Sequence, residues 1–231
     1  MTYTSPLRYP GGKSALANYI KLLVQENDLL DGVYVEPFAG GAGVALSLLF
    51  NEYMSRIVIN DLNSSIHAFW YSVLNHTQEL WDLIEETDVT VAEWQNQKLI
   101  QDGENASMLE LGFSTFFLNR TNRSGIINGG IIGGIEQKGE WKIDARYNKM
   151  DLIGRIQKIA RYRDRISLYN YDASRLIEEV VPNLPEKTFI YLDPPYYKKG
   201  QDLYQNHFVH EDHEALADLM KENRNYFWLI T

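Results

Sequence analysis

The sequence has 231 residues, of which 45% are hydrophobic and 23% are charged, and this composition suits a folded protein with a full apolar core. It contains no cysteine, which excludes disulfides, thiolate metal sites and cysteine nucleophiles, and no apolar stretch is long enough to cross a membrane. The net charge is −9, but residues 120–165 carry eleven Lys/Arg against five Asp/Glu (+6, leaving −15 elsewhere), so a segment that contacts nucleic acid is compatible with the negative total.

The opening residues 6–13 are rich in turn formers and lead into a helix predicted from Ser14. Gly11-Gly12-Lys13-Ser14 matches the end of a phosphate-binding loop, but Leu7 stands where that motif needs its first glycine, and no strand precedes it. Two interpretations of Lys13 remain. Either the glycines deliver it to a ligand at the start of the helix, or it is a solvated surface lysine.

A strand, a glycine-rich loop and a helix are predicted over residues 33–50. Glycines such as Gly40 let the backbone approach a ligand closely, and the helix start favours a polar group there. A second strand ends at Asp61, 21 residues after Gly40, which is the spacing at which an acid binds ribose hydroxyls. Because Glu36-Pro37 replaces the usual dinucleotide pattern, the loop suits a nucleoside without a pyrophosphate; a purely structural turn is the alternative.

Residues 64–120 are predicted to be helical, in segments 64–86, 91–101 and 106–119, with aromatic side chains at helical spacing that we assign to the core. The basic segment follows. Its residues 141–146 alternate in polarity and are predicted to form the second arm of a β-hairpin. Arg and Asn side chains on such a hairpin can read guanine and adenine edges in DNA, and a solvated loop is the alternative. A helix is predicted at 150–163.

Residues 166–172 are predicted to form a strand that ends in Tyr171-Asp172, where Asp172 either accepts a hydrogen bond from an adenine amino group or caps the next helix. The apolar strand 188–192 is followed by Asp193-Pro194-Pro195-Tyr196. Two prolines cannot continue a central strand, so Asp193 projects at its carboxyl end, where open α/β sheets bind ligands. A carboxylate, a fixed carbonyl and an aromatic face suit a flat ring that bears an amino group; an ordinary turn is the alternative.

His210 and His213 have H-x-x-H spacing without a third ligand, so we expect no metal site there and predict a helix from Asp212. Residues 226–231 are predicted to form the last strand.

Taken together, the motifs resemble those of the Dam-like (D12 or α) group of N6-adenine DNA methyltransferases, in the same order, from Leu7 to Thr231. The resemblance implies an α/β fold with a Rossmann-like, S-adenosylmethionine-dependent methyltransferase sheet and an inserted, mainly helical target-recognition domain that bears the β-hairpin. The implied catalytic domain is discontinuous, 1–64 and 165–231, around a recognition domain at 65–164. The segments that carry the resemblance are Pro10-Gly11-Gly12-Lys13, residues 36–43, Asn60-Asp61-Leu62-Asn63, residues 118–125 and Asp193-Pro194-Pro195-Tyr196.

The same resemblance implies roles for individual residues. Asp193 and Pro194 would meet the target adenine and Tyr196 would stack on it, while Asp61 would hold the ribose of the cofactor and Asp172 its adenine. The implied cofactor-binding residues are Tyr9, Lys13, Glu36, Phe38, Gly40, Gly43, Asp61, Tyr171, Asp172 and Asp193. The implied DNA-binding residues are Asn119, Arg120, Asn122, Arg123, Lys138, Lys142 and Arg146, and no metal is implied.

The implied activity is transfer of a methyl group from S-adenosylmethionine to N6 of an adenine flipped out of duplex DNA. The expected setting is the cytoplasm of a prokaryote, or a phage-encoded enzyme. The candidate partners besides duplex DNA are a restriction endonuclease or a missing C-terminal segment, and the sequence leaves this choice open. RNA adenine or cytosine N4 as the substrate is one alternative, and an inactive relative that binds DNA or a partner protein is another. Family members continue beyond the last strand here, so we expect 226–231 to form a sheet edge or to pair with a missing C-terminal segment.

Overall fold

The computed structural model describes residues 4–8, 16–194 and 210–231, and the chain divides into two compact units. The first, which we call the sheet unit, comprises Lys13–Ser64 and Asp164–Thr231. The second, which we call the helical unit, comprises Met1–Gly12 and Ser65–Arg163. Each unit therefore joins segments that are far apart in the sequence.

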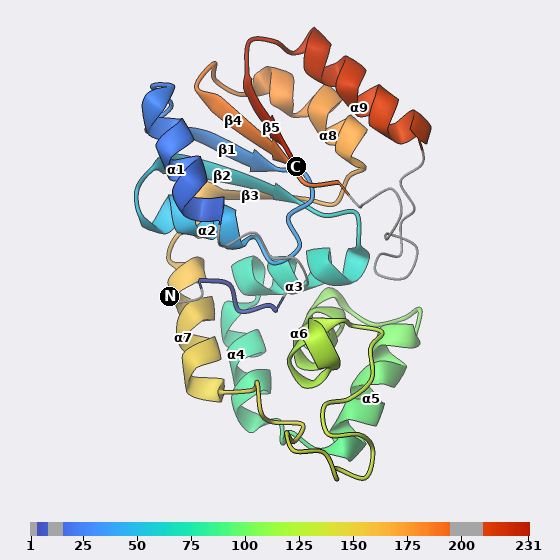
Figure 1. The fold of residues 1–231 in the computed structure, drawn as a ribbon. Helices are drawn as coiled ribbons and strands as arrows, with labels where there is room; N and C mark the ends of the chain where they lie inside the picture. Colours follow the sequence, from blue (N-terminus) through green and yellow to red (C-terminus); the bar gives the residue numbers. More distant parts are fainter. Residues whose placement is uncertain (1–3, 9–15, 195–209) are drawn as a thin grey trace. The chain divides into compact units, whose positions relative to one another are not determined.

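Five parallel strands form the centre of the sheet unit, in the order β3-β2-β1-β4-β5 (Figure 1). Parallel strands with both faces covered are apolar along their whole length, and β1 and β4 are buried at every position for this reason. The architecture confirms the predicted α/β fold with a Rossmann-like sheet. The strands are β1 Gly32–Glu36, β2 Met54–Asn60, β3 Ile166–Tyr169, β4 Thr188–Leu192 and β5 Phe227–Ile230.

Helices cover both faces of this sheet (Figure 1). Helices α1 (Ala17–Glu26) and α2 (Gly43–Phe50) pack on one face, and α8 (Ala173–Glu179) and α9 (His210–Glu222) pack on the other. The chain adds β2 and β3 on one side of β1, and then β4 and β5 on the other. The order reverses between β1 and β4, and open α/β sheets bind ligands at the carboxyl ends of the strands beside such a reversal.

The helical unit is built from α3 (Ser64–Asn75), α4 (Thr77–Glu86), α5 (Val91–Asp102), α6 (Met108–Thr121) and α7 (Lys149–Ala160). Aromatic rings form its core: Phe69 stacks on Phe116 with 6.0 Å between ring centroids. The aromatic side chains assigned to the core from residues 64–120 are mostly buried, while Trp81 and Trp94 are half-buried. The buried ones are Phe69, Trp70, Phe113, Phe116 and Phe117.

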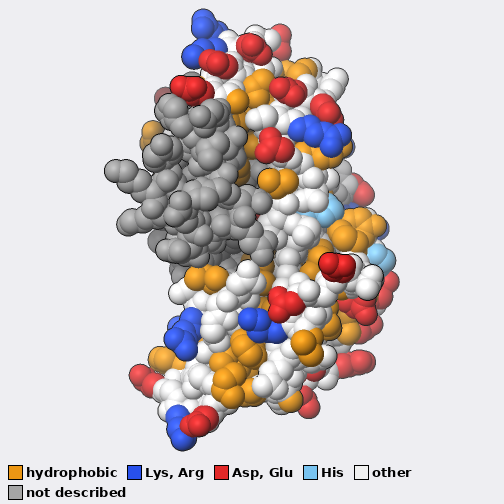
Figure 2. Space-filling view, turned by 90° about the vertical axis from the view of Figure 1, so that its right-hand side faces the viewer, with side chains coloured by type: hydrophobic (Ala, Val, Ile, Leu, Met, Phe, Trp, Pro, Cys, Tyr) orange, Lys and Arg blue, Asp and Glu red, His pale blue; other side chains and the backbone are white. Residues whose placement is uncertain are grey.

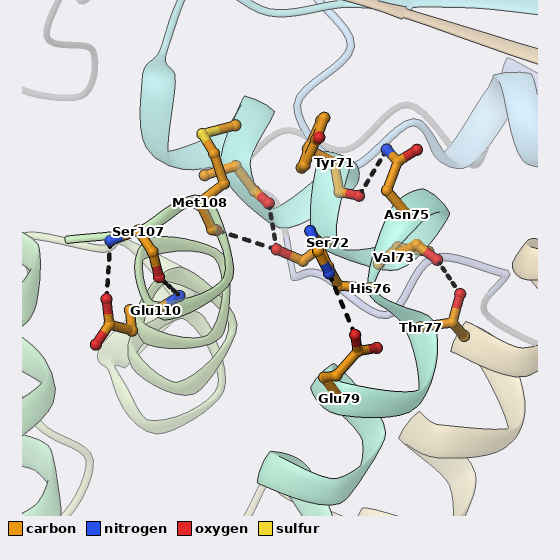
Figure 3. Close-up of polar contacts among 11 residues, drawn as sticks. Tyr71, Ser72, Val73, Asn75, His76, Thr77, Glu79, Ser107, Met108 and Glu110 are labelled. Carbon is orange, nitrogen blue, oxygen red and sulfur yellow. Dashed lines mark hydrogen bonds and ion pairs between the residues drawn. The ribbon is translucent and has the colours of Figure 1, made fainter.

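Side-chain hydrogen bonds set where these helices begin and end (Figure 3). The predicted continuous helix 64–86 is interrupted at His76, whose backbone is not helical. The side chain of Thr77 donates to Val73 O at 2.7 Å next to the break. At the start of α6, Ser107 and Glu110 each bond the other's backbone N–H, which is the reciprocal arrangement of a capping box.

The predicted β-hairpin is wrong. Residues 126–148 are all described, and they contain turns but no strand; the one isolated bridge that involves them joins Ile131 to Asn122. The side chain of Gln137 donates to Ile132 O at 2.8 Å and accepts from Ile143 N at 2.8 Å. These bonds occupy backbone groups that the strands of a hairpin would use to pair with each other. The side chain of Gln137 therefore competes with strand pairing, and the alternating polarity of the sequence gives no sign of this.

Several further boundaries differ by a few residues from the predictions; α7, for example, ends at Ala160 rather than at residue 163. Strand β3 ends at Tyr169 rather than at Asp172, α9 begins at His210 rather than at Asp212, and α6 begins at Met108. Strand β5 lies at one edge of the described sheet. In the described part of the chain, no helix combines the length and the apolar character needed to span a membrane.

Candidate functional site

Three acidic side chains gather at the carboxyl edge of the sheet. Glu36 is the last residue of β1, Asp61 directly follows β2, and Asp193 directly follows β4. These three strands are adjacent and parallel, so their carboxyl ends meet at one edge, beside the reversal in strand order. The structure therefore brings together the acids of three separate sequence motifs.

The glycine-rich loop after β1 is tied to Asp61. The backbone N–H of Gly40 donates to Asp61 Oδ2 at 2.8 Å, and the N–H of Asn63 donates to Asp61 Oδ1 at 2.9 Å. Gly40 has φ +45° and Ala42 has φ +47°, so the loop turns through the left-handed region twice before α2 begins. Both carboxylate oxygens are thus oriented by backbone donors at the rim of the loop.

Burial perturbs two of these acids. Desolvation raises the pKa of Glu36 to about 8; a hydrogen bond from the Ala45 backbone opposes the rise, and the charges of Asp193 and Asp61 add to it. Desolvation also raises the pKa of Asp61 to about 6, against the two backbone hydrogen bonds from Asn63 and Gly40. Glu36 Oε2 is buried and has no hydrogen-bond partner among the described residues. A cationic or hydrogen-donating ligand group would complement this oxygen.

Asn60 is buried and holds the edge together, although the motif around Asp61 gave it no role of its own. Its side-chain amide donates to Pro37 O at 2.9 Å and to Tyr171 O at 2.9 Å, and its carbonyl accepts from Tyr171 N at 2.8 Å. The loop after β1 and the end of β3 are therefore fixed to the same side chain. The available signal was a polar residue at the end of an otherwise apolar strand, directly before Asp61.

Asp193 is half-buried at the end of β4, and Pro194 beside it is buried. The hydroxyl of Thr231 donates to Asp193 Oδ1 at 3.1 Å.

Some residues that were predicted to bind the cofactor or the base lie outside the described residues, namely Tyr9, Lys13 and Tyr196. The side chains of His210 and His213 also lie outside the described part. No cluster of three or more metal-ligating side chains occurs among the residues that were described.

The remaining predicted cofactor residues lie around the same edge. Phe38 is half-buried and packs against the core beneath α8, and Gly43 begins α2. Tyr171 is half-buried with the guanidinium of Arg175 4.1 Å from its ring centroid. Asp172 accepts from Ser174 N at 2.9 Å and caps α8, so the second of its two predicted roles is the one seen in the ligand-free chain.

Three predicted DNA-binding residues are buried inside the helical unit. Asn119 bonds both Arg8 N, at 2.7 Å, and Arg8 O, at 2.6 Å. Arg120 donates from Nε to Pro6 O at 2.7 Å, and Asn122 accepts from Trp94 Nε1 at 2.6 Å. Their hydrogen-bonding groups face the protein interior, and this placement does not fit direct reading of DNA bases.

Arg120 is buried next to other cations. Desolvation, with the charges of Arg155 and Arg8, lowers the pKa of Arg120 to about 9. Arg155 donates to Ser5 O at 2.9 Å, so two guanidinium groups bind carbonyls of the same N-terminal segment. We call this set of contacts, between residues 5–8 and Asn119, Arg120, Asn122 and Arg155, the N-terminal clamp.

The other predicted DNA contacts are on the surface. Four of them are exposed, namely Arg123, Lys138, Lys142 and Arg146. The guanidinium of Arg146 lies 5.8 Å from the ring centroid of Trp141, which is also exposed. On the face drawn in Figure 2, basic and acidic side chains are interspersed rather than gathered in one basic field. The candidate contacts on this unit are therefore individual side chains on the 123–146 loop.

A shallow cavity of about 550 Å³ lies at the opposite edge of the sheet, at the amino ends of the strands. Its lining includes Gly32, Ser55 and Lys187. It contains none of the three acids at the carboxyl edge, so it is separate from the candidate site.

Comparison with known proteins identifies the family. The family model for D12 class N6 adenine-specific DNA methyltransferases matches residues 9–230. The chain belongs to this family. The match covers both the acidic edge of the sheet unit and the helical unit, and it confirms the resemblance drawn from the motifs.

Two relatives of this D12-class chain are modification enzymes. Modification methylase StsI of Streptococcus sanguinis is 27% identical over 83% of this chain and 28% of the relative. Type II methyltransferase M1.LlaDCHI of Lactococcus lactis subsp. cremoris is 22% identical over 93% of this chain and 75% of the relative. The D12-class chain thus spans little more than a quarter of the streptococcal relative and three quarters of the lactococcal one.

Proposed function

We propose that this chain transfers a methyl group from S-adenosylmethionine to N6 of adenine in duplex DNA. The observation that carries the proposal is the position of Asp193, which follows β4 at the reversal of strand order and lies on the same edge as Glu36 and Asp61. The family match supports adenine N6 as the target atom.

The residues at the carboxyl edge fit S-adenosylmethionine. Asp61 is held with its carboxylate at the rim of the glycine loop and would accept hydrogen bonds from the ribose hydroxyls. Glu36 carries a buried oxygen without a described partner, which suits the positively charged part of that cofactor. When bound, the cofactor supplies an electrophilic methyl group on a sulfonium. We further propose that Tyr9, Lys13, Phe38, Gly43 and Tyr171 line the rest of its site.

Asp193 and Pro194 would act on the target base. The amino nitrogen of adenine is a weak nucleophile because its lone pair is delocalised into the ring. Hydrogen bonds from this amino group to the Asp193 carboxylate and the Pro194 carbonyl would favour a more tetrahedral nitrogen. They would also stabilise the positive charge that develops on it, from groups that are already in place before the reaction.

The target nitrogen cannot be reached inside a duplex, so the adenine would leave the base stack and enter the acidic edge. We propose that Tyr196 stacks on the flipped ring, a contact generally worth about 1–3 kcal/mol.

Exposed cations of the helical unit would contact the DNA backbone or bases. These cations are Arg123, Lys138, Lys142 and Arg146. The division into a catalytic part (1–64 and 165–231) and a target-recognition part (65–164) is part of the same proposal.

The names of the two relatives support a further proposal, that this chain is the modification partner of a restriction endonuclease. A methyltransferase of this kind would protect host DNA at the site that the endonuclease cuts. The test is to co-express this chain with its partner endonuclease in a host cell. Host DNA methylated by this chain should resist cleavage by the endonuclease, and cleavage of that DNA would contradict the proposed partnership.

The function is tested with tritiated S-adenosylmethionine and unmethylated DNA, followed by digestion of the product to nucleosides. Label in N6-methyl-2′-deoxyadenosine is expected. Label in N4-methyl-2′-deoxycytidine, label only with RNA, or no transfer would each contradict the proposal. Asp193→Ala should lower the rate about a hundredfold or more while cofactor affinity falls far less. Asp218→Ala, at an exposed acid on α9, is the matched control and should retain full activity.

A further inference from the structure

Two hydroxyl groups, from Tyr191 in β4 and from Thr231 directly after β5, form a chain of hydrogen bonds that ends at the Asp193 carboxylate. Tyr191 Oη lies 3.0 Å from Thr231 Oγ1, and Thr231 Oγ1 lies 3.1 Å from Asp193 Oδ1. Strand pairing fixes this geometry, because β4 and β5 are parallel with Leu192 opposite Ile230, and Thr231 N donates to Leu192 O at 3.1 Å. Thr231 is thereby held beside the first residue after β4.

The hydrogens in this chain can run in only one direction when Asp193 is ionised. A carboxylate only accepts hydrogen bonds, so the Thr231 hydroxyl must donate its single hydrogen to Asp193. The Thr231 oxygen is then an acceptor, and the Tyr191 phenol must donate to it. The Tyr191 ring is fully buried in the sheet and gives the chain a rigid origin.

We propose that Thr231 and Tyr191 are positioning residues for methyl transfer, with Tyr191 donating to Thr231 and Thr231 donating to the Asp193 carboxylate, so that the carboxylate is aimed at the amino group of the target adenine. This inference rests on the proposed function. A side-chain carboxylate can rotate about its last bond, and a donor fixed to one oxygen limits that rotation. Small errors in the alignment of reacting groups are costly in rate, up to about a hundredfold for a displacement of about 1 Å.

The test compares kcat, the KM for DNA and the Kd for S-adenosylmethionine in three variants. Thr231→Val keeps the shape but removes the donor, and it should lower kcat about tenfold with both binding constants within about twofold of wild type. Thr231→Ser restores the hydroxyl and should return kcat to within about threefold of wild type. Tyr191→Phe should lower kcat by about threefold. Tyr19→Phe, at an exposed tyrosine on α1, is the matched control and should have no effect.

The double variant separates a relay from two independent effects. If Tyr191 acts through Thr231, adding Tyr191→Phe to Thr231→Val should lower kcat no further. Full kcat in Thr231→Val, equal losses in the Val and Ser variants, or additive losses in the double variant would each overturn the inference. These outcomes all require active wild-type protein. Absence of adenine methylation by wild type would instead overturn the proposed function, and this role together with it.

Discussion

At the scale of single residues, the surroundings of Glu36 determine its protonation state. It ends a fully buried strand, and desolvation dominates the rise of its pKa to about 8. Near neutral pH the ligand-free protein therefore holds this carboxyl largely protonated. Ionisation becomes favourable when a positive group takes the place of the missing solvent, which is the electrostatic requirement of a sulfonium-binding site.

The pKa of Glu36 predicts a pH-dependent stability of the ligand-free chain. The folded state binds this proton more tightly than the unfolded state, so its contribution to stability is fully present below about pH 4.5 and is lost as pH rises towards 8. Asp61, with its pKa raised to about 6, acts in the same direction at lower pH. Glu36→Gln stays neutral and should raise the free energy of unfolding at pH 8.5 by a few kcal/mol.

Urea unfolding at pH 5.5, 7 and 8.5 measures this effect, and wild type and Glu36→Gln should diverge as pH rises. Glu178→Gln, at an exposed acid on α8, is a suitable control and should follow wild type. Parallel stability curves for wild type and Glu36→Gln would contradict the assigned ionisation.

Residue types and spacing were enough to find the acids of the candidate site. Asp61 and Asp193 each end a β-branched or aromatic run, and such runs are readable because buried parallel strands need apolar side chains on both faces. The roles of Asn60 and Thr231 were missed, because they depend on which backbone groups or carboxylate these side chains meet, and strand pairing decides that. The buried positions of Asn119 and Asn122 were missed because they depend on contacts with Arg8 and Trp94, which are distant in the sequence.

At the scale of elements, the N-terminal clamp joins residues 5–8 to the end of α6. Gly125 lies against the clamp: its φ is +78°, and an added Cβ would lie 2.5 Å from Arg8 O. Gly125→Ala should therefore strain the backbone and push the N-terminal segment away, lowering the free energy of unfolding by about 1–3 kcal/mol.

Gly154→Ala provides the matched substitution with the opposite sign. Gly154 lies within α7 and an added Cβ would meet nothing within 4 Å, so alanine should stabilise the helix by about 0.5–1 kcal/mol. Thermal and urea unfolding of the two variants gives the comparison. A Gly125→Ala protein as stable as wild type would show that the clamp tolerates displacement.

Element boundaries were predictable where one periodicity persists and failed where side chains compete with the backbone. The helices of the 64–121 region follow the apolar spacing closely, apart from the break at His76. The 126–148 segment failed because Gln137 gathers several backbone groups into turns. A single glutamine carries no such signal in the sequence.

At the scale of the whole molecule, the charge distribution predicts how DNA binding depends on salt. The chain carries −9 overall, so its affinity for DNA must come from local cations such as Arg123 and Lys142. Each phosphate contact contributes about 0.9 to the slope of log K against log salt. Replacing both residues by alanine should weaken binding and reduce that slope by about 2, measured by fluorescence anisotropy between 50 and 200 mM salt.

Lys187→Ala is the control for this measurement, because Lys187 is an exposed cation at the amino edge of the sheet. It should leave the slope unchanged. An unchanged slope in the double variant would mean that the 123–146 loop does not contact phosphates.

The N-terminal clamp also bears on how the protein is made. Residues 5–8 leave the ribosome before their partners, which lie 111 to 150 residues further along the chain. At about 5–20 residues per second, the segment waits many seconds for Arg155 to be synthesised. Residues 5–8 therefore dock late during biosynthesis, only after α6 and α7 have been made, although they are synthesised long before those helices.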